Sequence, residues 1–65
     1  MTQYDVYNQF KIIFPQYTDH TEAWFPNGKH SVRIRLLDGN EFIFTYNNDL
    51  EWSFETVGMF INRLN

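Results

Sequence analysis

Residues 23–46 read AWFPNGKHSVRIRLLDGNEFIFTY, and this stretch decides the fold of the 65-residue chain. It holds three short runs in which apolar and polar residues alternate, separated by two glycine turns, Asn27-Gly28 and Asp38-Gly39. Alternation with a period of two is typical of strands that bury one face, and Asn-Gly is a strong hairpin signal. The stretch therefore predicts a three-stranded antiparallel meander.

The first hairpin is expected to turn at Asn27-Gly28, after a strand over residues 21–25 that ends at Pro26. A two-residue turn there pairs Ala23 with Val32 and sets Trp24 on the opposite face of the sheet. The residues of this hairpin that are expected to face the core are Ala23, Phe25, Val32 and Ile34.

The second hairpin requires a longer loop. A two-residue turn at Asp38-Gly39 would set Leu36 against Glu41 and bring an apolar face against a polar one. A three-residue loop over 37–39, with Gly39 in the left-handed conformation, removes this conflict and joins strands over 30–36 and 40–46. The expected pairs are Ile34 with Phe42 and Arg35 with Glu41, and the core-facing residues are Val32, Ile34, Leu36, Phe42, Phe44 and Tyr46.

A helix is expected on each side of the meander. Residues 2–13 carry apolar side chains at helical spacing, with Thr2 and Asp5 placed as a capping box and Pro15 beyond the end. Residues 16–20 are polar and are expected to form a loop.

Residues 54–64 repeat the helical spacing, and Ser53 is the expected N-cap of this second helix. A fourth short strand over 50–54, where apolar and polar residues also alternate, is the alternative. The predicted fold class is α+β, with the order α-β-β-β-α and both helices packed on one face of a three-stranded antiparallel sheet.

The composition limits the size of the core and the classes of partner. Residues 1–65 suffice for one domain, and Phe, Tyr and Trp make up 20% of the chain, which supports a core without a cofactor. With no Cys, neither a disulfide nor a thiolate metal site is expected. No signal peptide and no apolar run near the roughly 18 residues of a membrane span are found, so a cytoplasmic protein is expected. Self-association remains open as a further source of stability.

The chain has no arrangement of side chains typical of catalysis. Its only imidazoles, His20 and His30, lack the further ligands that zinc requires. Ser31 and Ser53 do not lie in a nucleophile motif. We therefore expect no enzymatic activity, no metal and no cofactor.

Charge is distributed unevenly along the chain. The net charge of −3 disfavours a general nucleic-acid binder. Lys29, Arg33 and Arg35 lie close together, whereas the segment from Asp38 to Glu55 holds five acids and no base. The two blocks either pair across the sheet or form a bipolar surface that steers a charged partner.

The strand pattern places four large side chains, Trp24, Arg33, Arg35 and Ile43, on the face of the sheet away from the predicted core. Trp and Arg are frequent in interface hot spots, so this patch is the candidate binding site of a small non-enzymatic protein-binding or accessory module. In the alternative interpretation the arginine stems cover Trp24 and Ile43 in a self-packed cation–π cluster. A second functional hypothesis is nucleic-acid binding through the same face, which salt dependence would distinguish.

The segment over 25–64 resembles small uncharacterised proteins of bacterial phages and mobile elements. The resemblance lies in FPNGK at 25–29, in FIFTY at 42–46 and in WSFETV at 52–57, and it implies no biochemical activity. The small size, the absence of catalytic residues, the outer sheet face and the acidic block suggest an accessory factor, inhibitor or regulator of host machinery carried by such an element. A three-stranded sheet followed by a helix also resembles the DNA-reading domains of some tyrosine integrases and of a class of plant regulators. That resemblance implies major-groove contacts by Trp24, Arg33 and Arg35, but the acidic balance and the N-terminal helix depart from it.

Overall fold

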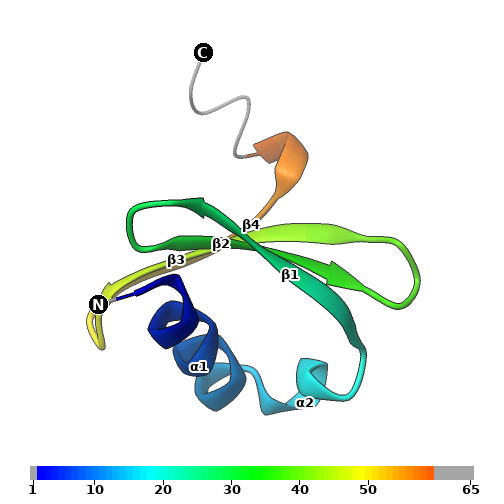
Figure 1. Ribbon diagram of the computed structural model, residues 1–65, viewed down its shortest axis with the longest axis horizontal. Coiled ribbons are helices and arrows are strands. Elements are labelled where there is room, and N and C mark those ends of the chain that lie inside the picture. The colour runs from blue at the N-terminus through cyan, green and yellow to red at the C-terminus, as the bar shows by residue number, and fades with distance from the viewer. Residues whose placement is uncertain (1, 60–65) are drawn as a thin grey trace.

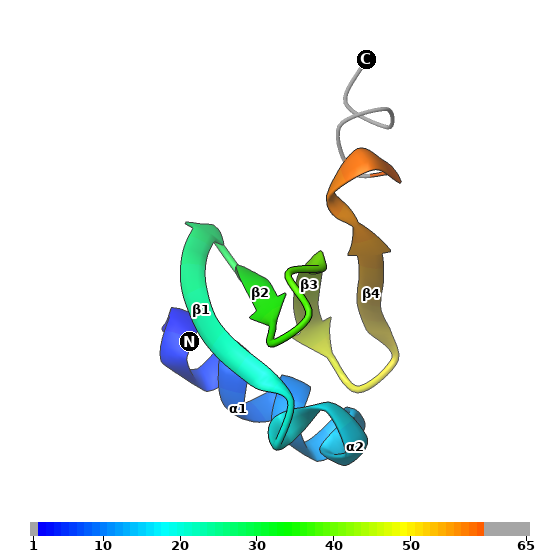
Figure 2. The ribbon, with the colours of Figure 1, turned by 90° about the vertical axis from the view of Figure 1, so that its right-hand side faces the viewer.

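The computed structural model describes residues 2–59, which form one antiparallel sheet with two helices on one face (Figures 1 and 2). The elements in chain order are α1 (Gln3–Ile13), α2 (Pro15–Thr18), β1 (Thr21–Gly28), β2 (Ser31–Leu36), β3 (Glu41–Asn48) and β4 (Glu51–Thr56). The strands lie in the order β1-β2-β3-β4. The α+β class is confirmed, but the sheet has four strands where the sequence predicted three. We call the sheet face away from α1 and α2 the outer face.

Helix α1 begins and ends where the sequence predicts. The backbone N–H of Asp5 donates to Thr2 Oγ1 (3.2 Å), and the backbone N–H of Thr2 donates to Asp5 Oδ2 (2.9 Å), which completes the capping box. The hydrogen bonds from the Thr2 backbone and then from its hydroxyl lower the pKa of Asp5 from its ordinary value of 3.8. Pro15 then starts α2, a single turn in a region that was expected to be loop.

The core lies between α1 and the helix-facing side of the sheet. Val6 and Phe10 from α1 meet Val32, Ile34 and Phe44, and all five side chains are fully buried. The six core-facing residues predicted for the second and third strands belong to this cluster or pack against it: Val32, Ile34, Leu36, Phe42, Phe44 and Tyr46.

The β2–β3 hairpin has the predicted register. Ile34 lies opposite Phe42. Gly39 has a φ of 91°, and the Leu36 N–H donates to the Asn40 carbonyl oxygen (2.9 Å) to close the three-residue loop. Glycine adopts positive φ at no steric cost, which is why the loop ends at this residue.

The β1–β2 hairpin differs from the prediction. Its turn lies at Lys29-His30 rather than Asn27-Gly28, and Trp24 pairs with Ile34. The register also slips by one residue at Asn27, between Pro26 and Gly28. This bulge reverses the faces of the preceding side chains, so the prediction that Ala23 and Phe25 face the core is wrong.

Burial of Trp24 explains the change of register. Its ring stacks on Tyr7 of α1 with a centroid distance of 4.9 Å and an interplanar angle of 12°. A Trp side chain covers about 150–250 Å², so complete burial stabilises by about 4–6 kcal/mol. The observed turn holds His30 at a φ of 62°, which costs about 1–2 kcal/mol for a residue with a Cβ. Even the partial burial of Trp24 therefore outweighs the local turn preference.

Strand β4 occupies the residues that were expected to begin the second helix. Phe54 stacks on Phe42 at a centroid distance of 4.7 Å and lies 4.6 Å from Phe14. Ser53 lies within the strand, so its prediction as an N-cap is wrong. The alternative prediction of a fourth strand over 50–54 is confirmed, although the strand spans Glu51–Thr56. Pairing with β4 satisfies backbone groups that β3 would otherwise leave exposed as an edge strand.

The helix predicted over 54–64 lies only partly within the described residues. Residues 54–56 belong to β4, residues 57–59 are helical, and residues 60–64 lie outside the described residues. The two helices that share one face of the sheet are α1 and α2 (Figure 1).

Candidate functional site

The four residues predicted to bind a partner do not form one patch. Arg33, Arg35 and Ile43 lie on the outer face, where Arg33 is directly opposite Ile43. Trp24 lies on the other face of the sheet against Tyr7. The prediction that Trp24 is uncovered and joins the other three is therefore wrong, and the bulge in β1 is the cause.

Phe25 takes the place that was expected for Trp24. The Cζ atoms of Arg33 and Arg35 each lie 5.1 Å from the centre of its ring. The Nε atoms of the two arginines lie 3.1 Å from the two carboxylate oxygens of Glu41, and Arg35 Nε donates a hydrogen bond there. One carboxylate thus bridges two cations, and the predicted pairing of Arg35 with Glu41 is confirmed.

This cluster offers little free apolar surface. Ile43 is 2% exposed, and the side chains of Arg33 and Arg35 are 41% and 37% exposed. Ion pairs with this much exposure contribute roughly 0–1 kcal/mol each. The geometry resembles the self-packed alternative, with Phe25 as the aromatic residue, and a binding role for these residues stays a prediction.

The β1 edge of the sheet is protected against further strand pairing. Pro26 has no N–H to donate, and the register of β1 slips at Glu22 and at Asn27. Gln3 Nε2 of α1 also donates to the carbonyl oxygen of Gly28 (2.8 Å). Proline, bulges and coverage by another element are common ways in which natural sheets block their edges.

The β4 edge lacks these features. The sequence of β4, EWSFET, holds no Pro, Gly or Lys, and within the described residues only β3 lies beside it (Figure 2). Two apolar side chains are exposed at its start, Leu50 at 94% and Trp52 at 42%. The sequence analysis did not single out this edge, although the alternation of apolar and polar residues over 50–54 was the signal for it.

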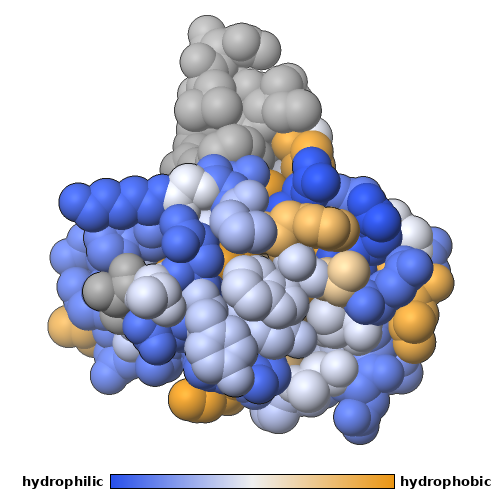
Figure 3. All heavy atoms as spheres, in the orientation of Figure 1, coloured by the Kyte–Doolittle hydropathy of each residue, from blue (hydrophilic) through white to orange (hydrophobic). Residues whose placement is uncertain are grey.

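Apolar residues are scattered over the face of the molecule in Figure 3. They form separate patches among hydrophilic residues rather than one continuous apolar surface. Large contiguous apolar patches are what usually mark a protein-docking face. Recognition of a partner on this face would therefore depend mainly on polar groups.

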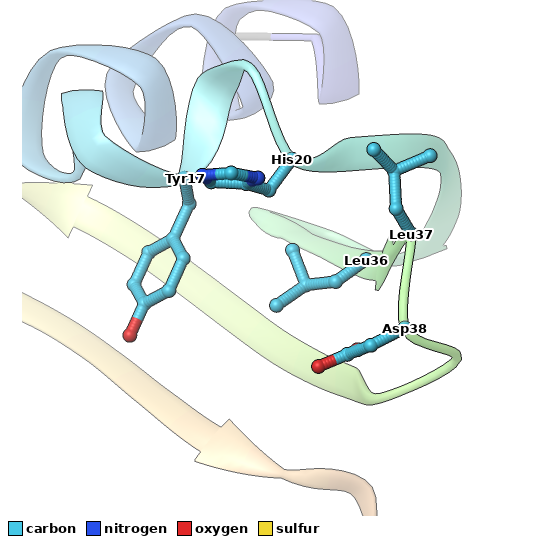
Figure 4. Close-up of a pocket in the computed structure, with 5 residues that line it drawn as sticks. All are labelled: Tyr17, His20, Leu36, Leu37 and Asp38. Carbon is cyan, nitrogen blue, oxygen red and sulfur yellow. The ribbon is translucent and has the colours of Figure 1, made fainter.

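A pocket of about 280 Å³ lies between α2 and the β2–β3 loop, and it is lined by Tyr17, His20, Leu36, Leu37 and Asp38 (Figure 4). The backbone N–H and the side-chain amide of Asn40 each donate to one oxygen of Asp38, both at 2.9 Å. The turn thus holds the carboxylate of Asp38 through one hydrogen bond to each of its oxygens. The volume also falls below the roughly 300–1,000 Å³ of typical small-molecule sites.

Residues 2–59 hold neither a candidate metal site nor a candidate membrane-spanning helix. No group of three or more His, Asp or Glu side chains there is placed to hold a metal ion. No helix in this part of the chain has the length and apolar character needed to cross a membrane. No protein-family model, curated protein or solved structure matches the chain. The geometry of the sheet is therefore the basis for the functional argument.

Proposed function

We propose that this chain is a non-enzymatic protein-binding module that receives an extended segment of a partner protein along the open edge of β4. The observation that carries the proposal is the contrast between the two edges. Proline, bulges and a helix side chain protect β1, whereas β4 holds no proline, the bulge beside it lies in β3 at Asn47, and Trp52 is exposed. Strand addition at an exposed edge is a common mode of peptide recognition.

The register of the sheet indicates which backbone groups β4 offers. The Tyr46 N–H donates to the His30 carbonyl oxygen (2.9 Å), so Tyr46 bonds toward β2. Neighbouring residues of an antiparallel strand bond to opposite sides, so Thr45 bonds toward β4, where its partner is Ser53. The residues of β4 that direct N–H and C=O groups to the open edge are therefore Trp52 and Phe54.

Two further observations support a binding role over catalysis or nucleic-acid binding. Asp38, which lines the pocket of Figure 4, is held by hydrogen bonds from Asn40 within its own turn. Glu41 offsets part of the charge of Arg33 and Arg35, which weakens the attraction for phosphates that nucleic-acid binding through the outer face would need. A module of this kind would also suit the accessory or regulatory role expected from the size of the chain and its lack of a catalytic motif.

Two substitutions at Trp52 test the proposal. Trp52→Thr removes the ring but keeps the outward N–H, whereas Trp52→Pro removes both. Proline is tolerated at an edge where its missing N–H faces solvent. With the full chain as bait in a lysate of its natural host, a specific partner should be captured more weakly by Trp52→Thr and more weakly still by Trp52→Pro. The further loss should be about two- to tenfold, as expected for one hydrogen bond.

Leu37→Ser serves as the control, because Leu37 is also an exposed apolar residue but lines the pocket beside α2 with Tyr17 and His20. Circular dichroism must show that all three variants remain folded. Capture by a folded Trp52→Pro that equals capture by Trp52→Thr would contradict strand addition. Capture that is lost when Arg33 or Arg35 is replaced, and weakens steeply with salt, would instead favour the outer face.

A further inference from the structure

The two faces of β4 differ in chemistry, and this difference limits what can pair with its edge. Trp52 turns toward the helices, where its ring lies 5.5 Å from Phe14 and 6.1 Å from Phe44. Glu51 alternates to the outer face and is exposed. An added strand would therefore have one set of side chains beside an aromatic ring and the other set beside a carboxylate.

The charge around β4 is acidic throughout. Asp49, Glu51 and Glu55 lie in or beside the strand, and the sequence from Asp38 to Glu55 contains no Lys or Arg. Asp49 accepts a hydrogen bond from the Tyr46 hydroxyl, and Glu51 accepts one from the Asn48 amide at 3.3 Å. These contacts involve neutral donors, so they leave the negative charge of both carboxylates uncompensated.

A second copy of the same strand offers no basic side chain to this edge, because β4 reads EWSFET. In a two-fold antiparallel pair centred on Ser53, Glu51 of one copy would lie opposite Glu55 of the other. Like charges directly opposite each other across a pair of strands are destabilising. The described part of β4 contains no basic residue that could relieve the repulsion.

We propose that the segment received at β4 is basic and amphipathic: an extended strand in which Lys or Arg alternates with apolar residues. Its basic side chains lie beside Glu51 on the outer face, and its apolar side chains lie beside Trp52. This inference rests on the proposed function and adds the chemical class of the partner. The chain itself contains a strand of this pattern, because β2 reads SVRIRL and both of its arginines meet Glu41 of β3.

Three synthetic peptides of nine residues test the inference. In each, Val alternates with a second residue, which is Lys in the first peptide, Thr in the second and Glu in the third. Titration of the isotope-labelled full chain, followed by NMR, gives both the affinity and the residues whose signals move. The Lys peptide should bind about tenfold more tightly than the Thr peptide at low salt, as expected for one or two partly exposed ion pairs. The largest shifts should fall on residues 50–56.

Glu51→Gln and Glu22→Gln form a matched pair of variants, because both glutamates are exposed and lie on the two opposite edge strands. Glu51→Gln should reduce the preference for the Lys peptide several-fold, whereas Glu22→Gln should leave it unchanged. Equal binding of the Lys and Thr peptides at residues 50–56 would overturn the basic partner while strand addition stands. Binding of the Lys peptide elsewhere on the chain, or of none of the three, would overturn this inference and strand addition together.

Discussion

Alanine substitutions at Trp24 and Phe25 test the register of the first hairpin, because the predicted and the observed registers rank them in opposite order. In the predicted register Phe25 is a core residue and Trp24 lies on the far face. In the structure Trp24 stacks on Tyr7 of α1, and Phe25 lies beneath two arginines on the outer face. The residue whose loss destabilises the protein more identifies the face that each side chain occupies.

The expected magnitudes follow from the contacts. Full burial of a Trp stabilises by about 4–6 kcal/mol, and a stacked aromatic pair adds about 0.5–1.5 kcal/mol. Trp24 is only partly buried, so Trp24→Ala should cost about 3 kcal/mol. Phe25→Ala removes two partly exposed cation–π contacts and some packing on the arginine stems, which amounts to about 1–2 kcal/mol.

Thermal and urea melts followed by circular dichroism measure the difference. In a domain of this size 1 kcal/mol corresponds to roughly 4–8 °C, so Trp24→Ala should lower the melting temperature by more than 10 °C. A small domain has a total stability of only about 3–10 kcal/mol, so Trp24→Ala could unfold it completely. Trp24→Phe is a milder variant that should remain folded, with a melting temperature between those of Trp24→Ala and the original protein. If Phe25→Ala proves more destabilising than Trp24→Ala and Trp24→Phe melts like the original protein, the described register is wrong.

Three other predictions concern β4, α1 and the β3–β4 turn. Ser53→Ala should change the free energy of unfolding by less than about 0.5 kcal/mol, because a strand residue makes no cap; a loss near 1 kcal/mol in urea melts would support the helix start instead. The lowered pKa of Asp5 means that its stabilising contribution is present above pH 3.8 and is lost as the pH falls through the folded value. Asp5→Asn should remove that acid dependence in melts across this range, whereas Thr2→Ala should only reduce it, because the backbone N–H of residue 2 still donates to the carboxylate. The hydrogen bond to Asp49 raises the pKa of Tyr46 above 10.0, so the stability it provides is present below pH 10 and is lost as the pH rises through the folded value. Burial also raises the pKa of Tyr7 above 10.0, so spectrophotometric titration should show two late-titrating phenols, of which Asp49→Asn moves only that of Tyr46 back toward 10.

Helix α1 and the β2–β3 hairpin could be predicted because the interactions that define them are local. Thr2 and Asp5 are three residues apart, and the capping box depends on no other part of the chain. In the hairpin, the conflict between an apolar and a polar face already excludes the two-residue turn at Asp38-Gly39. The hydrophobic pattern and the turn chemistry therefore agree, and the structure follows both.

The first hairpin could not be predicted in the same way, because the contact that sets it is not local. Asn27-Gly28 is a good turn sequence, but a turn there would leave Trp24 on the outer face. The stacking partner of Trp24 is Tyr7, which belongs to a different element and shares no sequence pattern with it. The free energy gained by tertiary burial can exceed that of a turn preference several-fold. Local turn chemistry alone therefore assigns the side chains of β1 to the wrong faces of the sheet.

The candidate site was missed because the edge of a sheet is a property of the whole topology. Phe54 would face the core both as a helix residue and as a strand residue, so its apolar character does not separate the two possibilities over 50–56. If this segment were helical, β3 would be the edge strand; because it is a strand, the unpaired backbone groups are those of β4. Among residues 2–59, the proline, the bulged edge strand and the covering helix side chain are all found at β1, where Pro26, Asn27 and Gln3 lie close together. The conformation of one locally ambiguous segment thus determines both the number of strands and the surface on which a partner strand could be added.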